Sequence, residues 1–229
     1  MKEKIIDRGH YVDVPERKEG AERIAAGTRV SLCEGLAGDR YFILEEGAEL
    51  ELCLLMLSGR GASADIVVDF VGAHASADLS GIYVCKGEEE FNLKVTVRHR
   101  TGDCTSHQLF NGIIAGTARS AFDGRIIVAP DAQKIKAFQE NHNLLLSDAA
   151  RAETRPQLEI YADDVECSHG ATVGKLNEDE QFYMRSRGIP EDEAKVLQMI
   201  SFLSPVLEHV PEDKREAVRE RMEKVVREL

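Results

Sequence analysis

Residues 91–97 read FNLKVTV and alternate apolar and polar side chains at every position. Successive side chains of a β-strand point to opposite faces, so this alternation predicts a strand with one buried and one solvated face. The apolar members of the segment, which we expect to enter a core, are Phe91, Leu93, Val95 and Val97.

Short segments of the same kind lie on both sides of this strand, with glycines between them. We expect strands before it at 29–33, 40–44, 49–57, 64–71 and 79–85, and after it at 108–114, 119–122, 125–128, 134–138, 143–146, 158–161 and 165–169. No helical periodicity interrupts about 140 residues. So many short strands in succession predict a mainly β domain.

A sandwich, a barrel and a parallel β-helix could each use these strands. Three segments share an ending in which a small polar pair and a glycine precede β-branched residues: LSGIYV at 79–84, LFNGII at 109–114 and FDGRIIV at 122–128. Such recurrence favours stacked coils that bury a continuous core. A chain with no tryptophan and only 6% aromatic residues suits a narrow aliphatic interior. The period is irregular and no strict hexapeptide repeat occurs, so the residues favour a β-helix and leave the sandwich and barrel open. We expect this β core over residues 28–176, preceded by a polar arm over 1–27.

The sequence changes character after residue 176 and predicts a small α-helical domain over 177–229. Asn177 followed by Glu180 indicates a capped helix at about 178–186, and Pro190 and Pro211 precede two further helices. The second, at about 191–209, has apolar residues at helical spacing. We expect this wide apolar face to dock a partner protein through Leu197, Ile200, Leu203 and Leu207.

The segment LEIYADDVECSHGATVGK, residues 158–175, holds the densest set of potential metal ligands. In an extended strand, alternation places Cys167 and His169 on one face. Two ligands cannot complete a site, because a transition metal usually takes four or more. His142 is a candidate third ligand. We prefer to place Asn141, His142 and Asn143 at a turn between coils, because asparagines at inward bends of stacked coils commonly form ladders. Asp163 and Asp164 are interpreted as a turn.

The resemblance to a known family rests on AFQENHNLLLSDAARAETRPQLEIY at 137–161, ADDVECSHGATVG at 162–174 and QFYMRSRGI at 181–189. These segments resemble the SufB/SufD family of iron–sulfur cluster assembly scaffolds, and the SufD side most. The resemblance implies a right-handed parallel β-helix and a non-enzymatic scaffold. It implies that Cys167 and His169 serve cluster assembly at the contact with SufB. Where SufB carries a central cysteine, this chain has Ala149, Ala150 and Arg151.

The same resemblance implies partners: a SufB-like or identical subunit, and a SufC-like ATPase docked on the helical domain. Iron or an iron–sulfur cluster would be held transiently and shared, with none tightly bound by one chain alone. An alternative from another class is a metal-dependent enzyme on a β-helix that uses His142, Cys167 and His169. A third is a structural homodimer in which the Cys–His pair has no function.

Charge and cysteine content limit the binding partners and cellular compartments that we expect. Twenty-nine basic and 41 acidic residues give a net charge of −12, which argues against nucleic acid as a partner. No apolar run is long enough for a membrane span, no signal peptide is evident, and no nucleotide-binding motif occurs. Five cysteines without a paired framework predict a reduced, cytoplasmic protein. We expect the other four, Cys33, Cys53, Cys85 and Cys104, in the core, and His99 and His107 at the surface.

Overall fold

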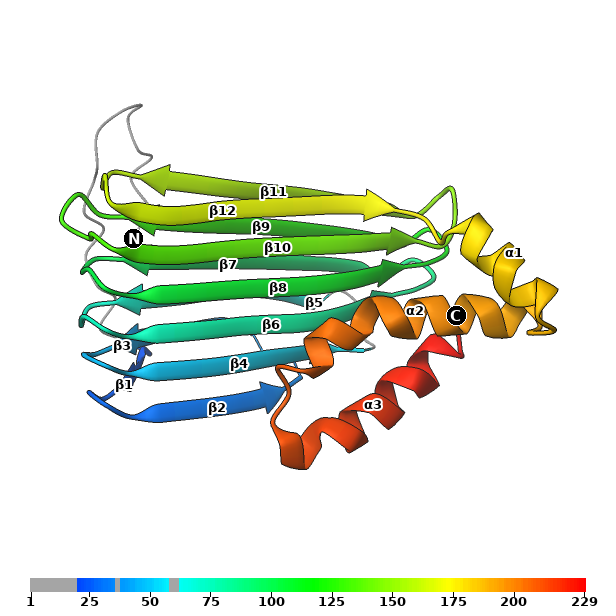
Figure 1. Ribbon diagram of the computed structural model, residues 1–229, viewed down its shortest axis with the longest axis horizontal. Coiled ribbons are helices and arrows are strands. Elements are labelled where there is room, and N and C mark those ends of the chain that lie inside the picture. Colours follow the sequence, from blue (N-terminus) through cyan, green and yellow to red (C-terminus); the bar gives the residue numbers. More distant parts are fainter. Residues whose placement is uncertain (1–19, 36–37, 58–61) are drawn as a thin grey trace.

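The computed structural model describes residues 20–35, 38–57 and 62–229, and places β-strands before α-helices (Figure 1). Odd-numbered strands form one six-stranded parallel sheet, here called the odd sheet: β1 (Glu22–Ile24), β3 (Arg40–Leu44), β5 (Ala62–Phe70), β7 (Glu90–His99), β9 (Arg119–Val128) and β11 (Arg151–Ile160). Even-numbered strands form the second, the even sheet: β2 (Arg29–Glu34), β4 (Glu49–Met56), β6 (Ser76–Cys85), β8 (Thr105–Ile114), β10 (Ile135–Leu145) and β12 (Val165–Gly174).

The chain crosses from one sheet to the other at every turn and returns beside the strand two positions earlier. Thus β7 pairs in parallel with β5 and β9, and β8 pairs in parallel with β6 and β10. Figure 1 shows the two sheets stacked face to face, with their strands running in opposite directions. The protein is therefore a parallel β-solenoid, as predicted, and neither a barrel nor an antiparallel sandwich.

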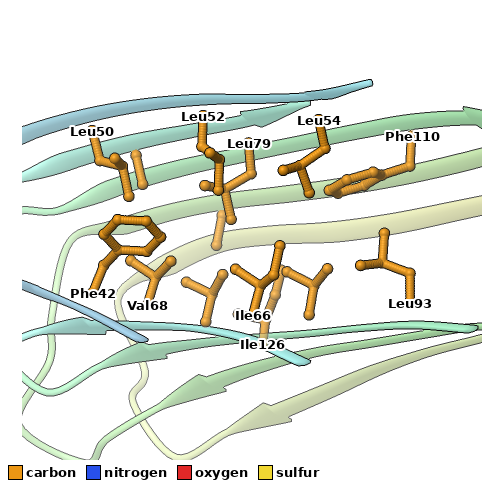
Figure 2. Close-up of a cluster of buried hydrophobic side chains, with 14 of the residues drawn as sticks. Phe42, Leu50, Leu52, Leu54, Ile66, Val68, Leu79, Leu93, Phe110 and Ile126 are labelled. Atoms are coloured by element: carbon orange, nitrogen blue, oxygen red, sulfur yellow. The ribbon is translucent and has the colours of Figure 1, made fainter. Parts of the chain in front are cut away.

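The core fills the space between the two sheets. Figure 2 shows side chains of the even sheet, including Leu52 and Phe110, facing side chains of the odd sheet, including Ile66 and Leu93. All four are 2% exposed or less. The apolar half of the alternation in residues 91–97 is confirmed, because Phe91, Leu93, Val95 and Val97 are all buried. Thr96, on the opposite face, is buried as well, so that face is not solvated throughout. Burial of aliphatic surface, worth about 25 cal/mol per Å², is the main force that holds the coils together.

Two strands of the solenoid are longer than their hydrophobic pattern predicts. Segments 119–122 and 125–128 form the single strand β9, and segments 134–138 and 143–146 form β10. Asn141 and Asn143 lie inside β10 with their side chains buried, so the expected turn at these residues is wrong. Strand β1 also lies within the region that we assigned to a polar arm.

Three helices follow the solenoid: α1 (Glu178–Ser186), α2 (Glu191–Leu207) and α3 (Glu212–Val226). The predicted cap of α1 is confirmed, because Asn177 Oδ1 accepts hydrogen bonds from the backbone N–H groups of Asp179 (2.9 Å) and Glu180 (3.2 Å). This cap satisfies two N–H groups that a helix start would otherwise leave unpaired.

Helices α2 and α3 pack against the outer face of the even sheet (Figure 1). A second apolar cluster joins them to residues of β4, β6 and β8, among them Leu55, Val84 and Ile113. Asn111 Nδ2 donates a hydrogen bond to the carbonyl oxygen of Phe202 at 2.7 Å, which fixes α2 on β8. His209 Nδ1 lies 3.0 Å from a carboxylate oxygen of Asp78 on β6. The helical region is thus fastened to the middle coils.

His99, predicted to lie at the surface, is buried at the end of β7. Its Nε2 lies 2.9 Å from Ser106 Oγ, and its ring stacks on Phe70 with 4.4 Å between centroids. Burial lowers the pKa of His99 to about 3, so the imidazole is neutral at physiological pH. His107 lies on the outer face of β8, as expected, and stacks on Phe138.

Candidate functional site

Cys167 lies on β12, the last strand of the even sheet, and pairs in register with Ala137 of β10. Its half-buried side chain packs against the core between the sheets. Burial raises the pKa of the Cys167 thiol above its ordinary value, opposed in part by a hydrogen bond from the backbone of Ala137. The thiol is therefore protonated at neutral pH, and a metal ion would have to displace the proton to bind it.

His169 follows Cys167 on the same face of β12, as the alternation predicts, but it is exposed to solvent. Its neighbour in register on β10 is Gln139. Val165 and Cys167, nearer the start of the strand, pack on the core. The inward face of β12 therefore runs from a partly covered thiol to an open imidazole.

This exposure follows from the position of the last coil. In the described part of the chain, β12 pairs with β10 alone and β11 with β9 alone, so each has a second edge that no described strand covers. The side chain of Val173, which faces the interior like Cys167, is 45% exposed, and Ile160 of β11 is 38% exposed. An apolar interior that opens at a pair of unpaired strand edges is a surface suited to strand pairing with another protein.

Polar side chains line the solenoid interior just below this open end. Asn141 Nδ2 donates hydrogen bonds of 3.0 Å to Tyr83 Oη and to the carbonyl oxygen of Phe110, and Asn143 Nδ2 donates to Asn141 Oδ1 at 2.9 Å. The Tyr83 hydroxyl donates in turn to Asn143 Oδ1. Burial raises the pKa of Tyr83, which keeps this hydroxyl protonated as a donor. Sequence reasoning missed this network, although the Asn141–Asn143 repeat at a spacing of two could have revealed it.

A glycine makes room for the tyrosine in this network. Gly112 on β8 pairs in register with Tyr83 on β6 and with Asn143 on β10. A Cβ atom at Gly112 would lie 1.9 Å from Tyr83 Cε2, far inside van der Waals contact. The ring of Tyr83 therefore occupies the space of the missing side chain, which lets its hydroxyl reach across β8 to the two asparagines of β10.

His142 does not join Cys167 and His169. It points to the outer face of the even sheet, where its Nδ1 lies 2.8 Å from Thr172 Oγ1 and its Nε2 lies 3.3 Å from Glu140 Oε2. In the register of β10 and β12, His142 pairs with Thr172, five residues beyond Cys167. The ligand set of the metalloenzyme alternative is therefore not assembled. Among the described residues, no group of three or more His, Cys, Asp or Glu side chains is placed to hold a metal ion.

The apolar face of α2 is largely consumed by packing within the chain. Leu203 and Leu207 are 0% and 4% exposed in the cluster on the even sheet, so the expectation that they form an open docking surface is wrong. Ile200 is half-buried, and Leu197 is 39% exposed. Leu197 lines a groove of about 670 Å³ between α1, α2 and the end of β10, together with Tyr183 and Phe202.

These features define a class of protein: a parallel β-solenoid whose last coil has unpaired strand edges and carries Cys167 and His169 on its inner face. The comparison with known families places the chain more closely. Residues 36–202 match the family model described as "SUF system FeS cluster assembly, SufBD core domain". The chain therefore belongs to the SufBD family of iron–sulfur cluster assembly proteins. This confirms the resemblance seen in residues 137–189.

Similar curated proteins carry corresponding names. The chain is 37% identical to iron–sulfur cluster assembly protein SufD of Escherichia coli over 137 residues, which are 60% of this chain and 32% of that protein. It is 30% identical to SufD of Bacillus subtilis over 164 residues, 72% of this chain and 38% of that protein. A SufBD family protein of Synechocystis is 40% identical over 51% of this chain and 25% of its own length. The chain thus matches about a quarter to two fifths of the length of these relatives.

Within the residues that the structure describes, no helix has the length and apolar character needed to cross a membrane.

Proposed function

We propose that the chain is a SufD-like, non-catalytic scaffold subunit for iron–sulfur cluster assembly in the cytoplasm. The observation that carries this proposal is the position of Cys167 and His169 on the inner face of β12. This strand pairs with β10 along one edge and has no described partner along the other. Thiolate and imidazole are ligands that iron accepts, and thiolate is the usual ligand of iron–sulfur clusters. The family is described by its role in iron–sulfur cluster assembly, so we take the cargo of the Cys167 thiolate and the His169 imidazole to be iron or an iron–sulfur cluster.

The site is shared between two subunits in this proposal. Two side chains from one strand leave iron or a cluster with open positions, so the cargo is held weakly by one chain and completed by ligands from another. A SufB-like or identical subunit pairs with the free edges of β11 and β12. This pairing covers the exposed Val173 and brings the second ligand set to His169.

A SufC-like ATPase docks on the helical region and supplies the nucleotide cycle. Because Leu203 and Leu207 are buried, we assign the docking surface to apolar side chains that are exposed. These are Phe182 and Tyr183 of α1, 73% and 59% exposed, and Leu197 of α2. Tyr183 and Leu197 line the groove between α1 and α2, and Phe182 lies outside its lining. Exposed large apolar side chains of this kind are typical of a protein interface.

The test is complementation in cells that lack their own copy of the corresponding subunit. The double variant Cys167→Ala, His169→Ala is expected to reduce cluster maturation at least tenfold, while the folded state and subunit pairing, checked by light scattering, remain. Ser168→Ala is the matched control, since Ser168 lies between the two on the opposite face of the same strand. Full maturation with the double variant would refute the role of the pair. Tight stoichiometric iron binding by the isolated chain would refute a shared site.

A further inference from the structure

The inference concerns the residue beneath His169 and rests on the proposed role of that histidine. Three inward-facing side chains lie in one column across successive coils of the even sheet. Gln108 of β8 pairs in register with Gln139 of β10, and Gln139 pairs in register with His169 of β12. Neighbouring strands lie about 4.8 Å apart, so each side chain in the column is within hydrogen-bonding reach of the next.

The side chain of Gln139 is fixed in place. It is 1% exposed, and its Nε2 donates a hydrogen bond of 2.8 Å to Gln108 Oε1. It also crosses the interior to the odd sheet, where a Cβ atom on Gly124 would lie 2.4 Å from Gln139 Nε2. The bond below and the glycine beside it hold the amide in one orientation.

The oxygen atom of this amide, unlike its nitrogen, has no hydrogen-bond partner among the described residues. Gln139 Oε1 is buried and accepts no hydrogen bond from the described residues. Leaving a buried acceptor unpaired costs about 1–3 kcal/mol, so such an atom calls for an explanation. Gln139 Nε2 is turned to the coil below, and the next side chain in the column above is the exposed imidazole of His169.

We propose that Gln139 is a positioning residue for His169. His169 makes no hydrogen bond to Gln139 in the structure, and a turn of its ring lets Nδ1–H donate to Gln139 Oε1. This bond fixes the ring over the open end and selects the tautomer whose Nε2 carries the free electron pair. A histidine that binds metal through one nitrogen commonly donates its other N–H to an oxygen of the surrounding protein. Gln139 thus supplies the carbonyl oxygen that keeps the proton of His169 on Nδ1 and leaves Nε2 with a free electron pair for iron.

Nitrogen NMR of the histidine side chains in the whole chain tests this directly, at a pH where imidazole is neutral. His169 is assigned by comparison with His169→Gln. The native protein is expected to show the Nδ1–H form of His169, although an unrestrained histidine favours Nε2–H. Gln139→Met, which keeps the size but removes the acceptor, is expected to restore the Nε2–H form. Gln139→Glu, which retains an acceptor oxygen, is expected to keep Nδ1–H.

Leu79→Met is the matched control, because Leu79 of β6 lies below Gln108 in the same column and its replacement leaves both glutamine side chains and their hydrogen bond in place. It is expected to keep the native tautomer. An Nε2–H form in the native protein would overturn the proposal, as would the same tautomer in the native protein and Gln139→Met. A shift in both Met variants would also overturn it, since that would reflect general loosening of the interior.

A second measurement uses Fe²⁺ alone, under anaerobic conditions, with the paired subunits. Gln139→Met is expected to weaken Fe²⁺ binding roughly tenfold or more, as loss of such supporting partners does at other metal sites, and Leu79→Met to change it less than twofold. Unchanged Fe²⁺ affinity in Gln139→Met would overturn the proposal. The NMR result stands apart from the complementation test of Cys167 and His169, so failure of one is distinguishable from failure of the other.

Discussion

Burial sets the protonation state of the side chains that matter most in this molecule. The thiol of Cys167 has a raised pKa because it is partly withdrawn from water, so binding of a metal ion there would have to release its proton. Tyr83 remains a donor for the same reason. Burial lowers the pKa of His99 instead of raising it, because desolvation disfavours the cationic form of the imidazole.

At the residue scale, His99 predicts how stability depends on pH. Its pKa is about 3 in the fold and about 6.5 when unfolded, so the unfolded chain binds a proton that the folded chain refuses. The contribution of His99 to stability is complete above pH 6.5 and is lost as the pH falls towards 3. Lowering the pH from 7.5 to 5 is expected to cost about 2 kcal/mol of unfolding free energy, measured by urea denaturation.

His99→Gln removes this titration and keeps a hydrogen-bonding group near Ser106. Its stability is expected to fall less than that of the native chain over the same pH interval. The exposed His107 gives the control, since His107→Gln should follow the native pH dependence. Equal slopes for the native chain and His99→Gln would show that this histidine is charged or accessible in the fold.

The local sequence predicted only part of what individual residues do. Alternation placed Cys167 and His169 on one face, because strand geometry fixes that from spacing alone. It could not place His99, whose burial depends on Ser106 from the next strand and Phe70 from another coil. Nor could it show that Asn141 and Asn143 face the core, since their partner Tyr83 lies 58 or more residues away.

At the scale of elements, α2 shows how periodicity finds a buried face but not what buries it. The spacing of Leu203 and Leu207 correctly indicated an apolar stripe. The surface that buries this stripe is the outer face of β6 and β8. The alternation of residues in the strands did not predict that this outer face is apolar. Residues Ile82, Val84 and Ile113 on that face belong to segments that are apolar on both sides, and such segments are typical of strands covered twice.

The exposed apolar side chains of α1 predict where the proposed ATPase partner binds. Phe182→Asp is expected to abolish capture of a SufC-like ATPase, with at least a tenfold loss in a pull-down, because a charge replaces an apolar contact at 73% exposure. Its unfolding free energy should change by less than about 0.5 kcal/mol, as for most surface substitutions. Phe182→Leu keeps the apolar contact and should retain binding.

Leu203→Ala separates docking from packing. It is expected to lower stability by about 2–5 kcal/mol, since Leu203 is fully buried, and yet to bind the ATPase while the chain is folded. Capture that survives Phe182→Asp and disappears with Leu203→Ala would place the docking surface elsewhere.

At the scale of the whole molecule, the open last coil predicts the mode of pairing. Val173→Lys places a charge on the inward face of β12, where a paired subunit would bury it. An unpaired buried charge is costly, so pairing with an identical or SufB-like subunit is expected to weaken at least tenfold. Light scattering and co-purification measure this, and the lone chain should remain folded.

Glu88→Lys is the control for that variant, because it changes the net charge more and lies in the turn between β6 and β7, away from the last coil. It should pair normally. Equal pairing of Val173→Lys and the native chain would mean that the partner contacts another surface.

The fastening of α2 to β8 has a consequence for the last coil. The bond between Asn111 and Phe202 spans 91 residues, and the segment between them includes β10, β11 and β12. A coil at the end of a solenoid normally frays by releasing one free chain end. Here both ends of the segment are tied to the middle of the molecule, so a frayed last coil is a closed loop and gains less conformational entropy than a free tail would. The strand that carries Cys167 and His169 is therefore open to a partner and still restrained, much as a cross-link restrains the chain on either side of it.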